Sequence, residues 1–98
     1  MDIRFELNGT AFVWDEQKAR LNVVAHEGIT FELAAEVFFD PFFRLVDASR
    51  NDEARDAAIG YDSFGRLLFV VHIEFEGEYI RIISARKATL QERKDHDS

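Results

Sequence analysis

Alternating apolar and polar residues at the start of the chain predict a β-hairpin. Ile3, Phe5 and Leu7 alternate with polar residues, which is the period of a strand with one buried face. The dipeptide Asn8-Gly9 follows, and this pair is typical of two-residue hairpin turns. We therefore expect the apolar run 11–14 to return beside the first strand.

A helix is predicted directly after the hairpin, over about residues 16–25. Asp15 suits its N-cap, because an aspartate side chain accepts a hydrogen bond from a free N–H group of the first helical turn. Ala19 and Val23 are four residues apart and are expected on the buried side of this helix. Gly28 is expected to mark its end.

A second helix is predicted over about 31–39. Thr30 suits its N-cap, and apolar residues then recur at helical spacing. Asp40-Pro41 ends the helix, because the residue before a proline avoids the helical conformation.

Four strands are predicted in the second half of the chain, over 42–46, 55–61, 67–75 and 79–85. The segment 67–75 is apolar on both faces where it begins, which indicates a covered, central position in a sheet. Gly77-Glu78 suits a two-residue type II′ turn between the last two strands.

That turn would fix the register of the last two strands. Glu74 then faces Arg81, and His72 lies on the same face, away from the core. An error of one residue in the turn would invalidate this grouping of side chains.

A short helix is predicted at the end of the sequence, because Thr89 and Glu92 have the Thr-x-x-Glu spacing of a capping box. His96 lies near its end and is expected to be frayed and exposed. The expected fold class is α+β, with two N-terminal helices packed on a mostly antiparallel sheet of about four strands and the short helix at the end. Residues 1–98 are expected to form a single domain.

Composition limits the class of protein. Apolar residues make up 47% of the 98 residues, which is enough for a packed core, and the chain contains no cysteine. No apolar run approaches the roughly 20 residues of a membrane span, and no signal peptide is visible. These features predict a soluble, cytoplasmic protein without membrane contact.

The charge is acidic overall and uneven along the chain. The formal net charge is −7 at pH 7, which argues against tight binding to duplex nucleic acid and suits a basic protein partner. Residues 80–94 nevertheless carry five basic side chains against one acidic side chain. Within them Arg86-Lys87 stands just before a helix start, a position that favours an anion.

An ordered series of short motifs runs from the predicted hairpin to the predicted C-terminal helix. The series consists of Phe12-Val13-Trp14-Asp15, Lys18, Asn22, His26, Gly28, Phe31, Val37-Phe38, Asp40, Glu53-Ala54-Arg55, Ile59-Gly60, Gly65-Arg66, Ile80 to Thr89 and Glu92. In order and spacing, it resembles the BrnT family of type II toxins over about residues 12–96.

The resemblance implies a fold, an activity and partners. Members of the family resemble RelE-type ribonuclease toxins in fold, and they are understood as endoribonucleases that cleave RNA and arrest translation and growth. A neighbouring antitoxin, BrnA, neutralises the toxin in a hetero-oligomer. BrnA carries a ribbon-helix-helix part, so operator DNA is contacted only through the antitoxin.

One departure from the family pattern leaves a second hypothesis open. The family usually has Lys-His-Gly where this chain has Ala25-His26-Glu27-Gly28. The missing lysine and the added Glu27 both bear on phosphate binding. The alternative function is a catalytically degenerate binding module that acts as antitoxin partner and co-repressor.

Basic residues are the candidates for binding phosphate. Metal-independent RNA cleavage needs a base for the 2′-hydroxyl, a cation for the charge on phosphorus and an acid for the leaving 5′-oxygen. Arg81 and Arg86 are candidate catalytic cations, since the planar guanidinium matches phosphate oxygens. Arg66 and Lys87 are candidate RNA-binding residues. The structural alternatives are a cross-strand pair of Arg81 with Glu74, a solvated strand end, and an exposed turn residue.

Glu53 is the first candidate for the general base, and His26 is the alternative base or acid, because an imidazole titrates near neutral pH. The structural alternatives are a surface ion pair of Glu53 with Arg55 and a helix-end role for His26. His26, His72 and His96 lie in different elements without ligand spacing. We therefore expect no metal site and no cofactor.

Overall fold

The computed structural model describes residues 1–98 as an α+β fold built on one six-stranded sheet. The elements in chain order are β1 (Asp2–Leu7), β2 (Thr10–Asp15), α1 (Glu16–Ala25), α2 (Phe31–Glu36), the 3₁₀ turn η1 (Val37–Phe39), β3 (Arg44–Asp47), β4 (Asp56–Tyr61), β5 (Leu67–Phe75), β6 (Tyr79–Lys87) and α3 (Leu90–Asp97). The sheet order is β1-β2-β6-β5-β4-β3.

The sheet is larger than the sequence predicts, because the N-terminal hairpin joins it. Asn8 and Gly9 both have positive φ, as a type I′ turn requires, and β1 pairs with β2 as expected. Phe12 and Val13 of β2 then lie beside Ile80 and Arg81 of β6 in a parallel pair. All other neighbouring strands are antiparallel, so the sheet is mixed.

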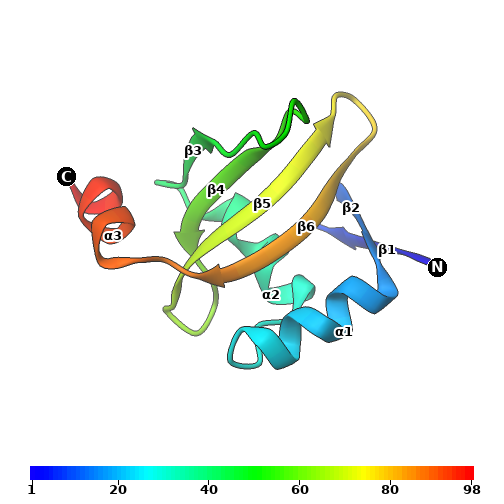
Figure 1. The fold of residues 1–98 in the computed structure, drawn as a ribbon, viewed down its shortest axis with the longest axis horizontal. Helices are drawn as coiled ribbons and strands as arrows, with labels where there is room; N and C mark the ends of the chain where they lie inside the picture. Colours follow the sequence, from blue (N-terminus) through cyan, green and yellow to red (C-terminus); the bar gives the residue numbers. More distant parts are fainter.

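Helices α1 and α2 lie next to each other along one side of the curved strands β5 and β6, whereas α3 lies at the other end, beside β3 and β4 (Figure 1). The core lies between α2 and the sheet. Its members, all buried, are Phe12, Trp14, Ile29, Phe31, Ala34, Ala35, Val37, Ala58, Leu68, Val70, Ile82 and Ala85. The face of β4, β5 and β6 that is turned toward the viewer in Figure 1 carries no helix.

The bounds of both N-terminal helices are close to those predicted. Asp15 accepts a hydrogen bond from the Lys18 N–H at 3.0 Å, and Thr30 accepts one from the Leu33 N–H at 3.1 Å. The second helix tightens into η1, and Asp40 then takes an extended conformation before the proline.

The prediction of which side of α1 is buried is right for one of its two residues. Ala19 packs against the core, but Val23 is exposed, and the one fully buried residue of the helix is Asn22. The Asn22 amide donates to the Ala85 carbonyl at 2.9 Å and to the Ile29 carbonyl at 3.1 Å. Its Oδ1 accepts from the Ala85 N–H at 3.0 Å. Asn22 thus supplies hydrogen bonds to backbone groups on the edge of β6 that the short pairing with β2 leaves without a strand partner.

The predicted register of β5 and β6 is wrong. The loop has three residues, Glu76–Glu78, with Gly77 at φ 78° and the Glu78 N–H bonded to the Phe75 carbonyl. Phe75 therefore faces Tyr79, and the pairs from Phe75 back to His72 shift by one residue from the type II′ prediction.

This shift moves the candidate side chains. Ile73, not Glu74, faces Arg81, while His72 faces Ile82 and is buried against Phe38 in the core. A bulge between Val71 and His72 shifts the pairing of β5 with β6 by one residue over the rest of the two strands. The predicted group of Arg81, His72 and Glu74 on the outer face does not exist.

A tight turn joins β3 and β4 where a polar loop was expected. Asn51 and Asp52 both have positive φ, 51° and 64°, and Arg50 and Glu53 exchange two backbone hydrogen bonds across them. This is the geometry of a two-residue type I′ hairpin. It places Arg50 and Glu53 at the tip of the hairpin between β3 and β4.

Helix α3 has the predicted capping box, in which Thr89 and Glu92 satisfy each other's backbone N–H groups. The expectation for His96 is wrong, because its side chain is buried. The imidazole stands edge-on to Tyr61 with 5.4 Å between ring centroids, and Nε2 lies 3.5 Å from Asp40 Oδ2. Burial against β4 holds the end of this helix.

Candidate functional site

A pocket of about 430 Å³ opens on the helix-free side of the sheet. It collects side chains from the end of α1, the β3–β4 hairpin, β5 and β6. Its lining residues are His26, Ala48, Ser49, Arg50, Arg55, Phe69, Val71, Ser84 and Arg86. We call it the arginine pocket, because it holds three arginines.

Arg86 is the most firmly held of the three arginines. Its guanidinium lies over the Phe69 ring, 4.0 Å from the centroid. Nη1 and Nη2 donate to the two carboxylate oxygens of Glu92 at 2.8 and 2.9 Å. Arg86 hydrogen bonding lowers the pKa of Glu92, with a further contribution from the Thr89 N–H. Glu92 is therefore ionised at neutral pH, and Arg86 is fixed in plane and direction.

Arg55 is held by Glu53, the predicted general base. Its Nε and Nη2 both donate to Glu53 Oε1, at 3.1 and 2.8 Å. The Arg55 backbone N–H also donates to Ser49 Oγ at 3.3 Å. Glu53 itself is exposed and does not line the pocket, so it reaches the site through Arg55.

Arg50 and His26 are the two pocket residues whose charged or titratable groups have no partner. Arg50 makes no ion pair and no side-chain hydrogen bond, although it lines the pocket. The half-buried His26 imidazole also makes no hydrogen bond, since only the backbone of His26 serves as the C-cap of α1. Both groups are thus available to a ligand in the pocket.

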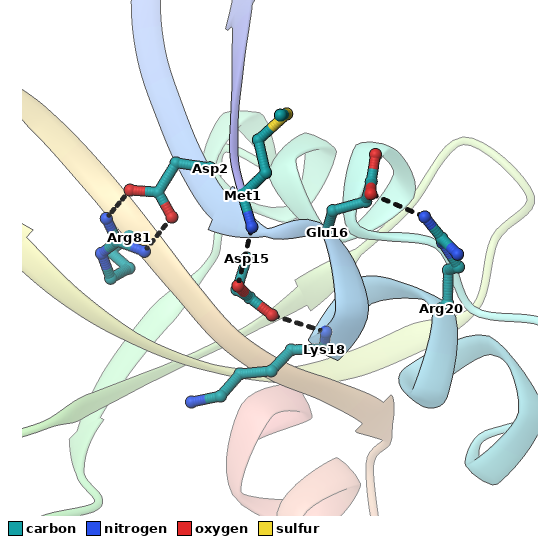
Figure 2. A network of polar contacts seen from close by, with 7 residues as sticks. All are labelled: Met1, Asp2, Asp15, Glu16, Lys18, Arg20 and Arg81. Atoms are coloured by element: carbon teal, nitrogen blue, oxygen red, sulfur yellow. Dashed lines mark hydrogen bonds and ion pairs between the residues drawn. The ribbon is translucent and has the colours of Figure 1, made fainter.

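Arg81 lies outside the arginine pocket, five residues before Arg86 on β6. Its Nη1 and Nη2 donate to the two carboxylate oxygens of Asp2 at 3.3 and 2.7 Å, as Figure 2 shows. The pair lowers the pKa of Asp2 and raises that of Arg81, in both cases chiefly through the side-chain hydrogen bond. The partner of Arg81 is therefore a residue of β1 and not Glu74.

Arg66 and Lys87 also lie apart from the pocket. Arg66 donates through Nε to the buried carboxylate of Asp62 at 2.9 Å, within the turn between β4 and β5. Lys87 Nζ lies 3.6 Å from the carboxylate of Glu27, the residue that follows His26. Of the six predicted site residues, the structure thus brings only His26 and Arg86 directly together.

Sequence reasoning missed most of the pocket wall. The β3–β4 hairpin contributes Ser49, Arg50 and Arg55 to the pocket. The sequence signal for this hairpin is the pair Asn51-Asp52, because asparagine and aspartate tolerate positive φ. Phe69 and Ser84 face outward beside Arg86 only in the true register.

The structure contains neither a cluster of metal ligands nor a membrane-spanning helix. No group of three or more histidine, cysteine, aspartate or glutamate side chains is arranged to hold a metal ion. No helix is both long and apolar enough to cross a membrane.

Three guanidinium groups, an imidazole and two hydroxyl groups around one pocket define a site suited to the phosphate groups of a nucleic acid. The comparison with known families agrees with this class. The chain belongs to the family described as "Ribonuclease toxin, BrnT, of type II toxin-antitoxin system", whose sequence model matches residues 14–92. No curated protein matches the chain significantly. A toxin of a type II system has an antitoxin as its partner.

Proposed function

We propose that this protein is a metal-independent endoribonuclease of the RelE-like type, and that it cleaves RNA in the arginine pocket and thereby arrests translation. The observation that carries the proposal is that the β3–β4 hairpin (Arg50 and Arg55), β6 (Arg86) and the end of α1 (His26) converge on one open face. Guanidinium groups match phosphate oxygens in shape and charge, and the open face leaves room for a single strand.

The chemistry would be an attack of the ribose 2′-oxygen on the adjacent phosphorus. The bond between phosphorus and the 5′-oxygen breaks, and the leaving 5′-oxygen takes a proton from solvent water, which leaves a 2′,3′-cyclic phosphate and a 5′-hydroxyl. His26 is our candidate to take the 2′-hydroxyl proton, because its imidazole is unpartnered inside the pocket. Arg55 and Arg86 would stabilise the charge that develops on the phosphate oxygens.

Glu53, the first candidate for the base from the sequence, is the alternative base in this proposal. Its Oε1 accepts both bonds from Arg55, and Oε2 makes none, so one oxygen is left for a proton. If His26 is the base, Glu53 serves to orient Arg55. His26→Ala and Glu53→Gln distinguish the two roles, since loss of the base should cost about 100-fold or more in rate.

Arg81, Arg66 and Lys87 are assigned to binding and not to the chemical step. Arg81 is about 16 Å along β6 from Arg86 at the usual rise of a strand, so it would contact RNA beyond the pocket. Lys87 pairs with the residue next to His26 and would contact the strand on that side.

The antitoxin would be of the BrnA type, with a ribbon-helix-helix part that contacts operator DNA in the hetero-oligomer. The net charge of −7 supports a basic partner. Residues 1–98 would act as one toxin domain in the cytoplasm, where RNA and antitoxin are both present.

The decisive experiment is expression from a tightly controlled promoter, alone and with the neighbouring gene. We expect growth arrest with loss of intact RNA, rescue by the neighbour, and relief by Arg55→Ala or Arg86→Ala in folded protein. Arg20→Ala, which removes an exposed arginine paired with Glu16 on α1, is the matched control. Normal growth with intact RNA would contradict the proposal.

A second function is supported by the ion pairs. Arg66, Arg81, Arg86 and Lys87 are each paired with a carboxylate of the chain itself. A degenerate binding module that acts as antitoxin partner and co-repressor would need no free cation. That module would bind the antitoxin tightly but would neither arrest growth nor cleave RNA.

A further inference from the structure

The Arg86 guanidinium has a free edge. Nη1 donates to both Glu92 and the Lys87 carbonyl, and Nη2 donates once, to Glu92. Nε makes no hydrogen bond. The two unused N–H groups, one on Nε and one on Nη2, lie along the same edge of the planar group.

Two parallel donors on one edge are what a phosphate group binds in bidentate fashion. Arg86 lines the arginine pocket, so this edge is the part of the side chain that is left for a ligand there. Glu92 occupies the neighbouring, end-on edge formed by Nη1 and Nη2, and the Phe69 ring, 4.0 Å away, fixes the plane.

Glu92 is itself held rigidly. Its Oε1 accepts the Thr89 N–H at 2.8 Å, and its own N–H donates to Thr89 Oγ1 at 3.1 Å. The capping box therefore fixes the carboxylate at the start of α3, and the carboxylate fixes Arg86.

We propose that Glu92 is a positioning residue, which holds Arg86 by its end-on edge so that the Nε and Nη2 edge binds a phosphodiester of the RNA. The inference rests on the proposed function, because it assigns a role within the same pocket. Glu92 does not touch the RNA, and it acts only through Arg86. Without it, the guanidinium would still carry its charge but would no longer present two donors in a fixed direction.

The first test is a double-mutant cycle on RNA cleavage. Glu92→Gln keeps an oxygen for the Thr89 N–H but loses the charge and one of the two arginine bonds. We expect cleavage to fall about tenfold or more, since small displacements of a phosphate ligand are costly. In an Arg86→Lys background, which lacks the planar fork, Glu92→Gln should change the rate less than about twofold.

The matched control is Glu16→Gln, which breaks the exposed ion pair with Arg20 on α1 by the same substitution. It should leave cleavage unchanged. Circular dichroism and thermal unfolding would show that both glutamine variants are folded.

The second measurement does not depend on activity. Inorganic phosphate is titrated against ¹⁵N-labelled protein, and the Arg86 Nε–Hε resonance is followed. We expect a saturable shift in the wild type and a shift at least about tenfold weaker in affinity in Glu92→Gln. An Arg86 resonance that phosphate does not move in the wild type would overturn the proposal.

The two measurements separate the possible failures. Wild-type cleavage with a fully active, folded Glu92→Gln variant, or with equal losses in both backgrounds, would refute the positioning role and leave the ribonuclease intact. No cleavage at all, with a phosphate shift that depends on Glu92, would refute the ribonuclease and leave the positioning role.

Discussion

Asn22 shows how one polar side chain can replace a strand. It is 6% exposed, and it makes three hydrogen bonds that cross from α1 to β6 and to the α1–α2 connection. The β2–β6 ladder pairs only two residues of each strand, so the rest of this β6 edge needs another partner. A buried backbone group without one would destabilise the fold.

We therefore expect Asn22→Ala to lower the free energy of unfolding by about 2 to 4 kcal/mol, because the buried N–H and carbonyl of Ala85 would lose their hydrogen-bond partner. Urea denaturation followed by circular dichroism measures this loss. Gln17→Ala, an exposed residue of the same helix, is the control and should cost less than about 0.5 kcal/mol. Equal losses in the two variants would contradict the role given to Asn22.

At the scale of elements, α3 differs from the other helices because polar contacts attach it. Its only buried residue is His96, and Leu90, its one large apolar residue, is 70% exposed. The Glu92–Arg86 pair holds the start of the helix, and His96 holds its end beside Asp40 and Tyr61. Attachment of this helix therefore depends on charge states.

Glu92 should make this attachment sensitive to acid. Its pKa is lowered below the ordinary 4.5, mainly by the hydrogen bond from Arg86, so its ionised form is favoured in the fold. The stabilisation is present in full above that ordinary value and is lost as pH falls through the lower pKa of the folded state. We expect the Thr89 and Arg86 resonances to move together in this acidic range.

The same titration in Glu92→Gln provides the control, because the glutamine does not ionise. The coupled movement should disappear in that variant. If it persists, another carboxylate near α3 causes it.

Local signals in the sequence predicted the elements well, but not how they meet. Asp15, Thr30 and Thr89 mark helix starts, because a cap acts within three residues of itself. The register of β5 and β6 depends on whether the loop has two or three residues. One residue in the loop decides the pairing next to it and whether His72 faces the core, and composition around Gly77 does not fix that number.

The candidate site was predicted only in part for the same reason. His26 and Arg86 were found as residue types suited to the chemistry, and both line the pocket. Arg50 and Ser49 were not found, because their place in the pocket depends on how the β3–β4 hairpin meets β5 and β6, which are distant in the chain. Arg81 was found, but its pairing with Asp2 depends on how the N-terminal hairpin docks.

For the whole molecule, the proposed function raises the question of how an acidic protein would bind RNA, an acidic polymer. The net charge is −7, yet three arginines gather in one pocket, and one of them has no carboxylate partner. Short-range contact with phosphate at this pocket has to outweigh a weak long-range repulsion, which salt screens.

We therefore expect RNA binding to depend only modestly on salt. Three phosphate contacts on single-stranded RNA give a slope of about −2 for log Kobs against log salt concentration. Fluorescence anisotropy with a labelled oligonucleotide measures this slope on the His26→Ala variant, so that cleavage does not interfere. Arg50→Ala should make the slope shallower by about 0.7, and a slope near zero would exclude phosphate contacts as the basis of binding.

The arginine pocket is assembled from segments that are distant in the chain. His26 is the C-cap of the first helix, whereas Arg86 is held by an ion pair with Glu92 of the last helix. No fragment of the sequence contains a reduced version of the site. A copy whose synthesis stops before β6 is complete, or one cut between α1 and β6, is expected to be inert and not merely weak. Toxicity would then appear in a single step when the chain finishes folding, which gives a cell a defined interval in which to have the antitoxin ready.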